Sequence, residues 1–266
     1  MDLATILGLF SGVFLIGMGM YGGSIENAVP ITNFWSLNSV FIVLGGTIAA
    51  TAVAFPMKEV LRILGLISMV FKKPRYILPH IIEDIVKISE DYRSGEGQLV
   101  KNIDKIKNFF LKDGIQFIID DLKIEEIVEL LEKREFYRNE RETQEANLMN
   151  KMGVFAPAFG LVGTLIGLVF MLFAMGGQGS GADAATALGS AMGIALITTF
   201  YGAVLANLIF IPFSEKIKSR NTASSLESAM IIEGIKMIHY KKHPIIVREH
   251  LNSYLPPRER KKQINE

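Results

Sequence analysis

Residues 152–175 read MGVFAPAFGLVGTLIGLVFMLFAM, a stretch without a single charged side chain. A helix needs about 20 apolar residues to cross a hydrocarbon core of roughly 30 Å, so this stretch is long enough to span a membrane. Ala156, Gly160, Gly163 and Gly167 recur within it at helical spacing. They leave one face of the helix without bulk, which lets another backbone approach. The stretch therefore predicts a membrane helix that packs closely against a neighbouring helix.

Three further segments carry no charge and have similar lengths: Leu3–Tyr21, Phe34–Phe55 and Leu188–Ile211. The first lacks the basic start of a signal peptide, so we expect it to remain in the protein as a membrane helix. The region between the second and third spans is too polar for a membrane and shows no strand-like alternation. The predicted fold class is therefore all-α: a polytopic membrane protein with four transmembrane helices and a helical cytoplasmic domain.

The spans divide the chain into four predicted parts. Residues 1–55 are a first transmembrane hairpin, 56–151 a helical domain, 152–212 a second hairpin, and 213–266 a C-terminal helix with a basic tail. Apolar residues at helical spacing form two stripes between the hairpins: Ile63, Leu66, Ile67 and Val70, then Ile124, Ile127, Val128 and Leu131. Helix breaks are expected at five residues, namely Pro74, Pro79, Gly95, Gly97 and Gly114.

Basic residues predict the orientation in the membrane. The hairpin loops Gly22–Asn33 and Gly176–Ala187 contain no Lys or Arg, whereas the opposite ends of the spans are flanked by Lys58, Arg62, Lys72, Lys73, Arg75, Lys151, Lys216, Lys218 and Arg220. Because cytoplasmic loops carry the excess of Lys and Arg, both termini and the middle region are expected in the cytoplasm.

Composition excludes several classes of protein. Half of the residues are hydrophobic and 21% are charged, which excludes a disordered chain, and a net charge of +1 argues against a nucleic-acid partner. The absence of cysteine excludes disulfides, thiolate metal sites and cysteine nucleophiles. No metal-ligand cluster, nucleophile motif or phosphate loop is visible, and all four histidines lie outside the spans. Neither an enzyme nor a cofactor is expected.

The four spans contain no Asp, Glu, Lys, Arg or His. Ion-driven membrane proteins usually place an ionisable group at membrane depth, so either this chain moves no ions or a partner contributes the carboxylate. Polar side chains that could line a shared path are Thr164 on the third span and Ser190, Thr198, Thr199, Tyr201 and Asn207 on the fourth. The alternative for each hydroxyl is an ordinary hydrogen bond within its own helix.

Two prolines and two further glycine pairs complete the membrane features. Pro157 and Pro212 lie near the same end of the third and fourth spans, where a proline inside a helix produces a bend; alternatively, Pro157 starts a helix and Pro212 ends one. The small-residue spacing recurs at Gly189 and Gly193 and at Gly8 and Gly12. These faces predict contacts with other helices, either of a partner or within one four-helix subunit.

Three segments, APAFGLVGTLIGL, TTFYGAVLANLIFIPFSEKIK and FLKDGIQFIIDD, resemble the MotA/PomA family of flagellar motor stator proteins. The similarity covers nearly the whole chain. It implies a homopentamer around two copies of a MotB-like single-span partner, which supplies an aspartate at membrane depth, in the bacterial inner membrane. Flow of H⁺ or Na⁺ would then turn the pentamer against the rotor ring protein FliG and drive swimming. No cofactor is implied.

The resemblance also implies roles for individual residues. Pro157 and Pro212 match two family prolines linked to torque. Thr164 and Thr199 match positions of the ion pathway, beside Thr198 and Tyr201. A threonine at the position of Thr164 accompanies sodium in this family, which favours Na⁺ over H⁺.

The charged residues that are expected to contact the rotor match the family pattern less well. Arg93 matches the family arginine, but the expected glutamate is replaced by Lys101, so Glu96 and Asp104 are the nearest acidic candidates. The alternative for this charged cluster is a surface that is simply exposed to solvent.

The alternative function for the whole chain is that of the distantly related ExbB/TolQ subunits, which transduce energy to the cell envelope. Those proteins usually have three spans, and the two complete hairpins disfavour that alternative.

Overall fold

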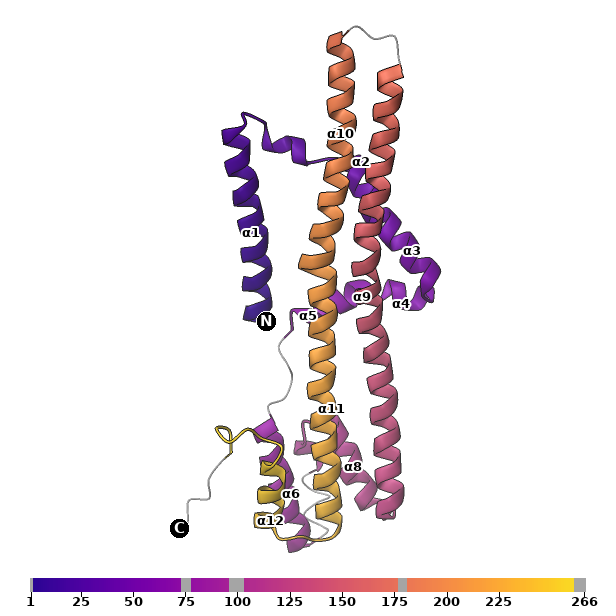
Figure 1. Cartoon of the computed structure of the whole chain (residues 1–266). Coiled ribbons are helices and arrows are strands. Elements are labelled where there is room, and N and C mark those ends of the chain that lie inside the picture. The colour runs from indigo at the N-terminus through magenta and orange to yellow at the C-terminus, as the bar shows by residue number, and fades with distance from the viewer. Residues whose placement is uncertain (1, 73–77, 96–102, 177–180, 261–266) are drawn as a thin grey trace. The chain divides into compact units, whose positions relative to one another are not determined.

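The computed structural model describes residues 2–72, 78–95, 103–176 and 181–260, and these residues form helices and no strand (Figure 1). Four of the helices formed by these described residues are long and apolar enough to cross a membrane. The predicted all-α, four-span fold is confirmed. The chain divides into two compact units, one formed by Met1–Lys73 and Thr143–Lys218, the other by Pro74–Glu142 and Ser219–Glu266.

The first hairpin belongs to the first unit. Helix α1 (Leu3–Glu26) is followed by the short 3-10 helix η1 (Ile31–Phe34). The second span consists of α2 (Leu37–Val40), a π-helical turn η2 (Phe41–Gly45) and α3 (Gly46–Ala54). Ser36 caps the start of this span, because its side chain accepts a hydrogen bond from the Ser39 amide. Two short helices, α4 (Met57–Leu61) and α5 (Ile63–Val70), follow.

The third and fourth spans are parts of much longer helices. Helix α9 (Ile124–Gly176) contains the predicted span 152–175, and α10 (Gly181–Val204) continues through the π-helical segment η4 (Leu205–Phe210) into α11 (Ile211–His239). The polar stretch before residue 152 is rich in Glu, Arg and Lys, which favour a helix as much as the apolar stretch does. Charged residues therefore mark the end of a membrane span, but they do not mark the end of the helix that contains it.

One apolar core holds the first unit together. It combines buried side chains from α5, α9, η4 and α11: Leu66, Val70, Ala146, Leu148, Met149, Met152, Ala156, Ala206, Phe210, Phe213 and Ile217. The first predicted apolar stripe faces this core, since Leu66 and Val70 are buried and Ile63 and Ile67 pack beside them. Helix α1 stays outside, with no buried residue.

The second unit has its own core. Helices α6 (Leu78–Ser94), η3 (Ile103–Lys105), α8 (Phe109–Ile119) and α12 (Pro244–Asn252) pack with the adjoining ends of α9 and α11. Fully buried side chains at its centre are Ile81, Ile85, Leu111, Ile115, Ile127, Leu131, Met230, Ile231 and Ile235. The second predicted stripe thus also faces a core.

Of the predicted helix breaks, the one at Pro79 coincides with the start of a helix and the one at Gly114 is wrong. Pro79 is the second residue of α6, where its missing N–H removes no helical hydrogen bond. Gly114 lies inside α8, and a Cβ there would stand 2.1 Å from Ile235 Cδ1, so the glycine permits close packing rather than a break. Gly95 does follow the end of α6, with a φ of 141° that favours glycine. Pro74 and Gly97 lie outside the described residues.

Candidate functional site

The membrane parts of α9 and α10 approach each other at backbone distance. A Cβ on Gly160 would lie 3.0 Å from the Thr198 carbonyl oxygen, and one on Gly167 would lie 2.7 Å from that of Ala191. A Cβ on Gly163 would meet the Thr198 side chain at 2.5 Å. These three predicted packing glycines therefore line a single contact with α10. Any larger side chain on this face would push the helices apart.

Three other predicted packing glycines make no such contact with the residues that the structure describes. Around Gly189 and Gly193 on α10, and around Gly8 on α1, an added Cβ would meet no atom within 4 Å. Gly12 differs, because its Cβ would meet Leu208 Cδ1 at 2.6 Å. The structure thus separates glycines that pack against another helix of the chain from glycines with open space around them.

The close approach brings Thr164 of α9 and Thr199 of α10 together. Their hydroxyl oxygens are 2.6 Å apart. The Thr164 hydroxyl also lies 3.1 Å from the Gly160 carbonyl oxygen and 3.2 Å from that of Ala195. The Thr199 hydroxyl lies 3.4 and 3.3 Å from the same two carbonyls. Four oxygens, two from each helix, thus form one cluster.

This cluster has more acceptors than donors. Each threonine hydroxyl carries one hydrogen, whereas each of the four oxygens carries lone pairs. The cluster is therefore suited to receive a hydrogen bond from another group or to contribute ligands to a hard cation. Thr164 is half-buried and Thr199 is exposed, so the cluster opens onto the surface of the chain.

Thr198 shares the Ala195 carbonyl oxygen with the cluster, whereas the Tyr201 hydroxyl has partners outside it. The Thr198 side chain is fully buried and its hydroxyl donates to the carbonyls of α10 itself, at Ile194 and Ala195. The Tyr201 hydroxyl donates to the Phe34 carbonyl oxygen at 2.6 Å and accepts from the Ser36 amide at 3.2 Å. Thr198 therefore packs against α9, and Tyr201 ties α10 to the start of the second span.

Both prolines lie within continuous helix. Pro157 is inside α9, and Pro212 is the second residue of α11, directly after the π-helical segment η4. The alternative that Pro157 starts a helix and Pro212 ends one is therefore wrong. Since proline has no N–H, the carbonyls of Gly153 and Leu208 lose their usual donors four residues later. The wider π register before Pro212 is a common consequence of such a disturbance.

Contacts between the two helices occur next to both prolines. A Cβ on Gly202 would lie 3.1 Å from Pro157 Cα, and one on Gly153 would lie 2.7 Å from Ile211 Cγ1. Pro157 is seven residues before Thr164, or about 10 Å along the helix. The weakened turns and the oxygen cluster thus belong to the same pair of packed helices.

Sequence reasoning missed two buried threonines of the second span. Thr47 and Thr51 of α3 are fully buried, and their hydroxyls donate to the carbonyls of Val43 and Thr47 at 2.6 and 2.7 Å. Their spacing of four residues, which places them on one helix face, was the available signal. Because each hydroxyl is satisfied one turn back, the pair serves helix packing in this chain.

The expected rotor residues lie in the second unit and have separate partners. Arg93, exposed in the last turn of α6, donates from Nη1 to the Lys241 carbonyl oxygen at 3.0 Å. Asp104 pairs with Lys112 at 2.8 Å, and this hydrogen bond lowers the pKa of the Asp104 carboxyl. Glu96 lies outside the described residues.

Comparison with known proteins identifies the family. Residues 102–230 match the model of the MotA/TolQ/ExbB proton channel family. Over the full length of both chains, the sequence is 33% identical to the chemotaxis protein PomA of Vibrio alginolyticus. The chain belongs to the MotA/TolQ/ExbB proton channel family.

Other relatives are motility proteins. The motility protein A of Treponema phagedenis is 31% identical over 98% of this chain and 96% of its own length. The solved structure of C. jejuni MotAB matches with a TM-score of 0.86 and 26% identity, over 99% of this chain and 100% of that chain.

These matches decide between the two functions considered from the sequence. The chain is a flagellar stator subunit of the MotA/PomA type, and the ExbB/TolQ alternative is disfavoured. Its family is a channel family and not an enzyme family. The four apolar helices and the stator relatives make it a multi-pass membrane protein.

Proposed function

We propose that this chain forms the wall of an ion path and generates torque when a MotB-like partner supplies the missing carboxylate. The observation that carries the proposal is the Thr164–Thr199 oxygen cluster, which is formed by two spans that contain no Asp, Glu, Lys, Arg or His. An ion at membrane depth needs a group that can accept and release it. The cluster provides neutral ligands, and the partner's aspartate provides the charge.

An exposed apolar stripe supports the place of the partner. Leucines on α9 follow the helical period beside Thr164 and are 40–64% exposed: Leu161, Leu165, Leu168 and Leu172. An apolar helix laid on this stripe would bring an acidic side chain within reach of the Thr164 hydroxyl. The C. jejuni structure contains MotA together with MotB. In the complex that we propose for this chain, five copies of it surround two copies of the partner.

The transported ion is Na⁺. Hydroxyl and carbonyl oxygens replace the hydration shell of a hard cation, and the four oxygens of the cluster are of these two kinds. A proton would need a titrating acid and a route, but not the threonine hydroxyls. Thr198 and Tyr201 support the path indirectly by holding α10 in place.

Motion is transmitted through Pro157 and Pro212. Each proline removes one hydrogen bond from a helix that also contributes to the second unit, α9 through residues before Pro157 and α11 through residues after Pro212, so a bend at either proline is transmitted along that helix. Arg93, Asp104 and Glu96, in the cytoplasm with both termini, present charges to the rotor ring protein FliG. Charge complementarity at such a surface guides partner choice more than it adds affinity.

A gene deletion tests this function against the envelope alternative. In a strain without a second stator set, deletion should leave cells that carry flagellar filaments but do not swim, and a plasmid copy should restore swimming. Cells that still swim after deletion would contradict the motor role. A defect confined to outer-membrane uptake would instead support the ExbB/TolQ alternative.

A further inference from the structure

Helix α1 contacts the rest of the first unit at two levels. At its start, the Asp2 amide donates to the Phe71 carbonyl oxygen at 2.9 Å, and the Asp2 carboxylate pairs with Lys216 at 2.5 Å. Further along, Gly12 lies against Leu208. The two levels are ten residues apart, or about 15 Å along the helix.

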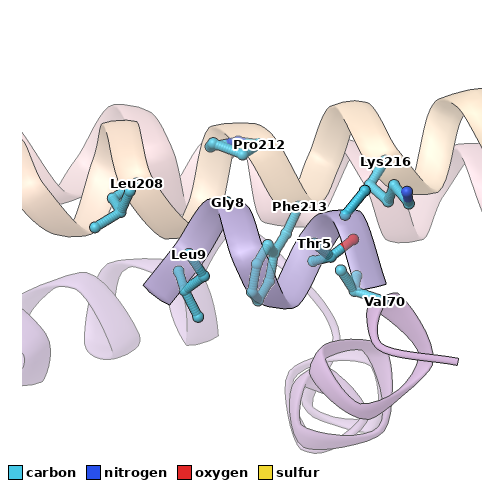
Figure 2. A pocket seen from close by; sticks show the side chains of 9 residues that line it. Thr5, Gly8, Leu9, Val70, Leu208, Pro212, Phe213 and Lys216 are labelled. Atoms are coloured by element: carbon cyan, nitrogen blue, oxygen red, sulfur yellow. The ribbon is translucent and has the colours of Figure 1, made fainter. Parts of the chain in front are cut away.

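A pocket of about 410 Å³ lies between these two levels (Figure 2). It is lined by α1, the end of α5, η4 and the start of α11, through Ala4, Thr5, Gly8, Leu9, Val70, Leu208, Pro212, Phe213 and Lys216. The pocket exists because α1 presents small residues here, Ala4, Thr5 and Gly8, which cannot reach the opposite wall. No atom lies within 4 Å of a Cβ built on Gly8.

The pocket is polar at one end and apolar at the other. The Lys216 side chain and the Thr5 hydroxyl lie toward the same end, whereas Leu9 and Leu208 lie toward the other (Figure 2). Asp2 belongs to the polar end through its ion pair with Lys216. The polar end therefore carries one negative and one positive group.

A helix is a poor occupant of the pocket, and so is water at its apolar end. Water finds no hydrogen-bond partners beside the side chains of Leu9 and Leu208. Two turns of a helix about 10 Å wide would occupy roughly 850 Å³, about twice the volume of the pocket. A single acyl chain is thin enough to enter. In a membrane, acyl chains surround α1, none of whose residues is buried.

We propose that this pocket binds one acyl chain of a zwitterionic phospholipid, such as phosphatidylethanolamine, with the headgroup at the Asp2–Lys216 pair. The phosphate lies by Lys216 and Thr5, and the ammonium lies by the Asp2 carboxylate. An anionic lipid satisfies Lys216 but leaves Asp2 without an added positive partner. Because Pro212 lines the pocket, the bound chain also packs against the turn that lacks a helical hydrogen bond.

Photo-crosslinking in nanodiscs tests the proposal on the full stator complex. The probe is phosphatidylethanolamine with a diazirine in one acyl chain, and adducts are located by peptide mass spectrometry. We expect adducts on the peptides that contain Leu9 and Leu208. Gly8→Leu, which fills the pocket, should reduce these adducts at least fivefold. Gly17→Leu is the matched control, since Gly17 also lies on α1 with no atom near its Cβ, and it should leave them unchanged.

Further variants keep the test decisive. Should Gly8→Leu fail to assemble, Ala4→Leu fills the same pocket. Adducts that persist in the filled variant, or that are absent from the parent complex, overturn the proposal. Adducts that fall on another protein chain in place of these two peptides overturn it as well. For the headgroup, unlabelled phosphatidylethanolamine should compete better than phosphatidylglycerol, and Asp2→Asn should abolish that difference. Equal competition in the parent complex would refute the headgroup assignment.

Discussion

The hydroxyl oxygens of Thr164 and Thr199 lie 2.6 Å apart on two antiparallel membrane helices, and both face the carbonyls of Gly160 and Ala195. This relationship depends on glycine. With any side chain at position 160, its Cβ would stand 3.0 Å from the Thr198 carbonyl oxygen and 3.2 Å from Thr199 Cα. The geometry of the Thr164–Thr199 oxygen cluster and the packing of α9 on α10 are therefore two consequences of the same small residue.

Gly167→Val should destabilise the subunit itself. Its Cβ would lie 2.7 Å from the Ala191 carbonyl oxygen, a backbone atom that cannot rotate away, and such overpacking costs typically about 1–3 kcal/mol. Thermal unfolding of the purified complex should occur at a lower temperature. The matched variant is Gly193→Val on the outward side of α10, which should alter assembly between subunits before it alters unfolding. Equal effects of the two variants would contradict the distinction between inward and outward glycines.

Pro157→Ala and Pro212→Ala should leave the complex assembled and abolish rotation. Alanine restores the helical hydrogen bond and removes the steric clash, which together cost about 3 kcal/mol in a helix interior. The helices become stiffer where the proposal needs them to bend. Membrane levels of the chain and co-purification of the partner measure assembly, and tethered-cell rotation measures torque. Normal rotation in both variants would show that neither proline is needed for torque.

Glu227 should make the second unit less stable as pH rises. Burial raises the pKa of its carboxyl above the ordinary value of 4.5, although a hydrogen bond from Asn108 at 2.7 Å partly opposes the shift. The folded state therefore binds the proton more tightly than the unfolded state, so stability is lost as pH rises from the unfolded pKa through the folded one.

Glu227→Gln keeps the acceptor for Asn108 and removes the charge. Hydrogen exchange of α11 in the purified complex should be slower in this variant than in the parent at neutral pH, and the difference should disappear in acid. Glu249→Gln, at an exposed position of α12, is the control and should show no such pH-dependent difference. Faster exchange in Glu227→Gln at neutral pH would mean that the charged form stabilises the fold.

The four membrane spans could be predicted from the sequence, because few structures other than a membrane helix accommodate a charge-free run of this length. The first and last residues of the helices could not be predicted in the same way. Nothing in the apolar run shows that α9 begins at Ile124 or that a π-helical segment precedes Pro212. The error at Gly114 has a tertiary cause, because Ile235 of a distant helix occupies the space that a side chain at position 114 would need.

The candidate site was only partly visible in the sequence. Spacing within one helix placed Gly160, Gly163 and Gly167 on one face, but no spacing rule relates Thr164 to Thr199, which are on different helices. The resemblance assigned both residues to the ion pathway, and the structure shows that their hydroxyls are in contact. Thr47 and Thr51 show the opposite case, since a simple spacing of four residues was present and was overlooked.

The central claim is that the Thr164 hydroxyl takes part in binding a sodium ion. The most direct measurement is the swimming speed of parent, Thr164→Ala and Thr164→Ser cells as a function of sodium concentration at constant pH. The parent speed should saturate with sodium. Loss of one oxygen ligand in Thr164→Ala should raise the sodium needed for half-maximal speed about tenfold, equivalent to about 1.4 kcal/mol, while Thr164→Ser should resemble the parent. A parent speed that does not change with sodium would contradict the claim.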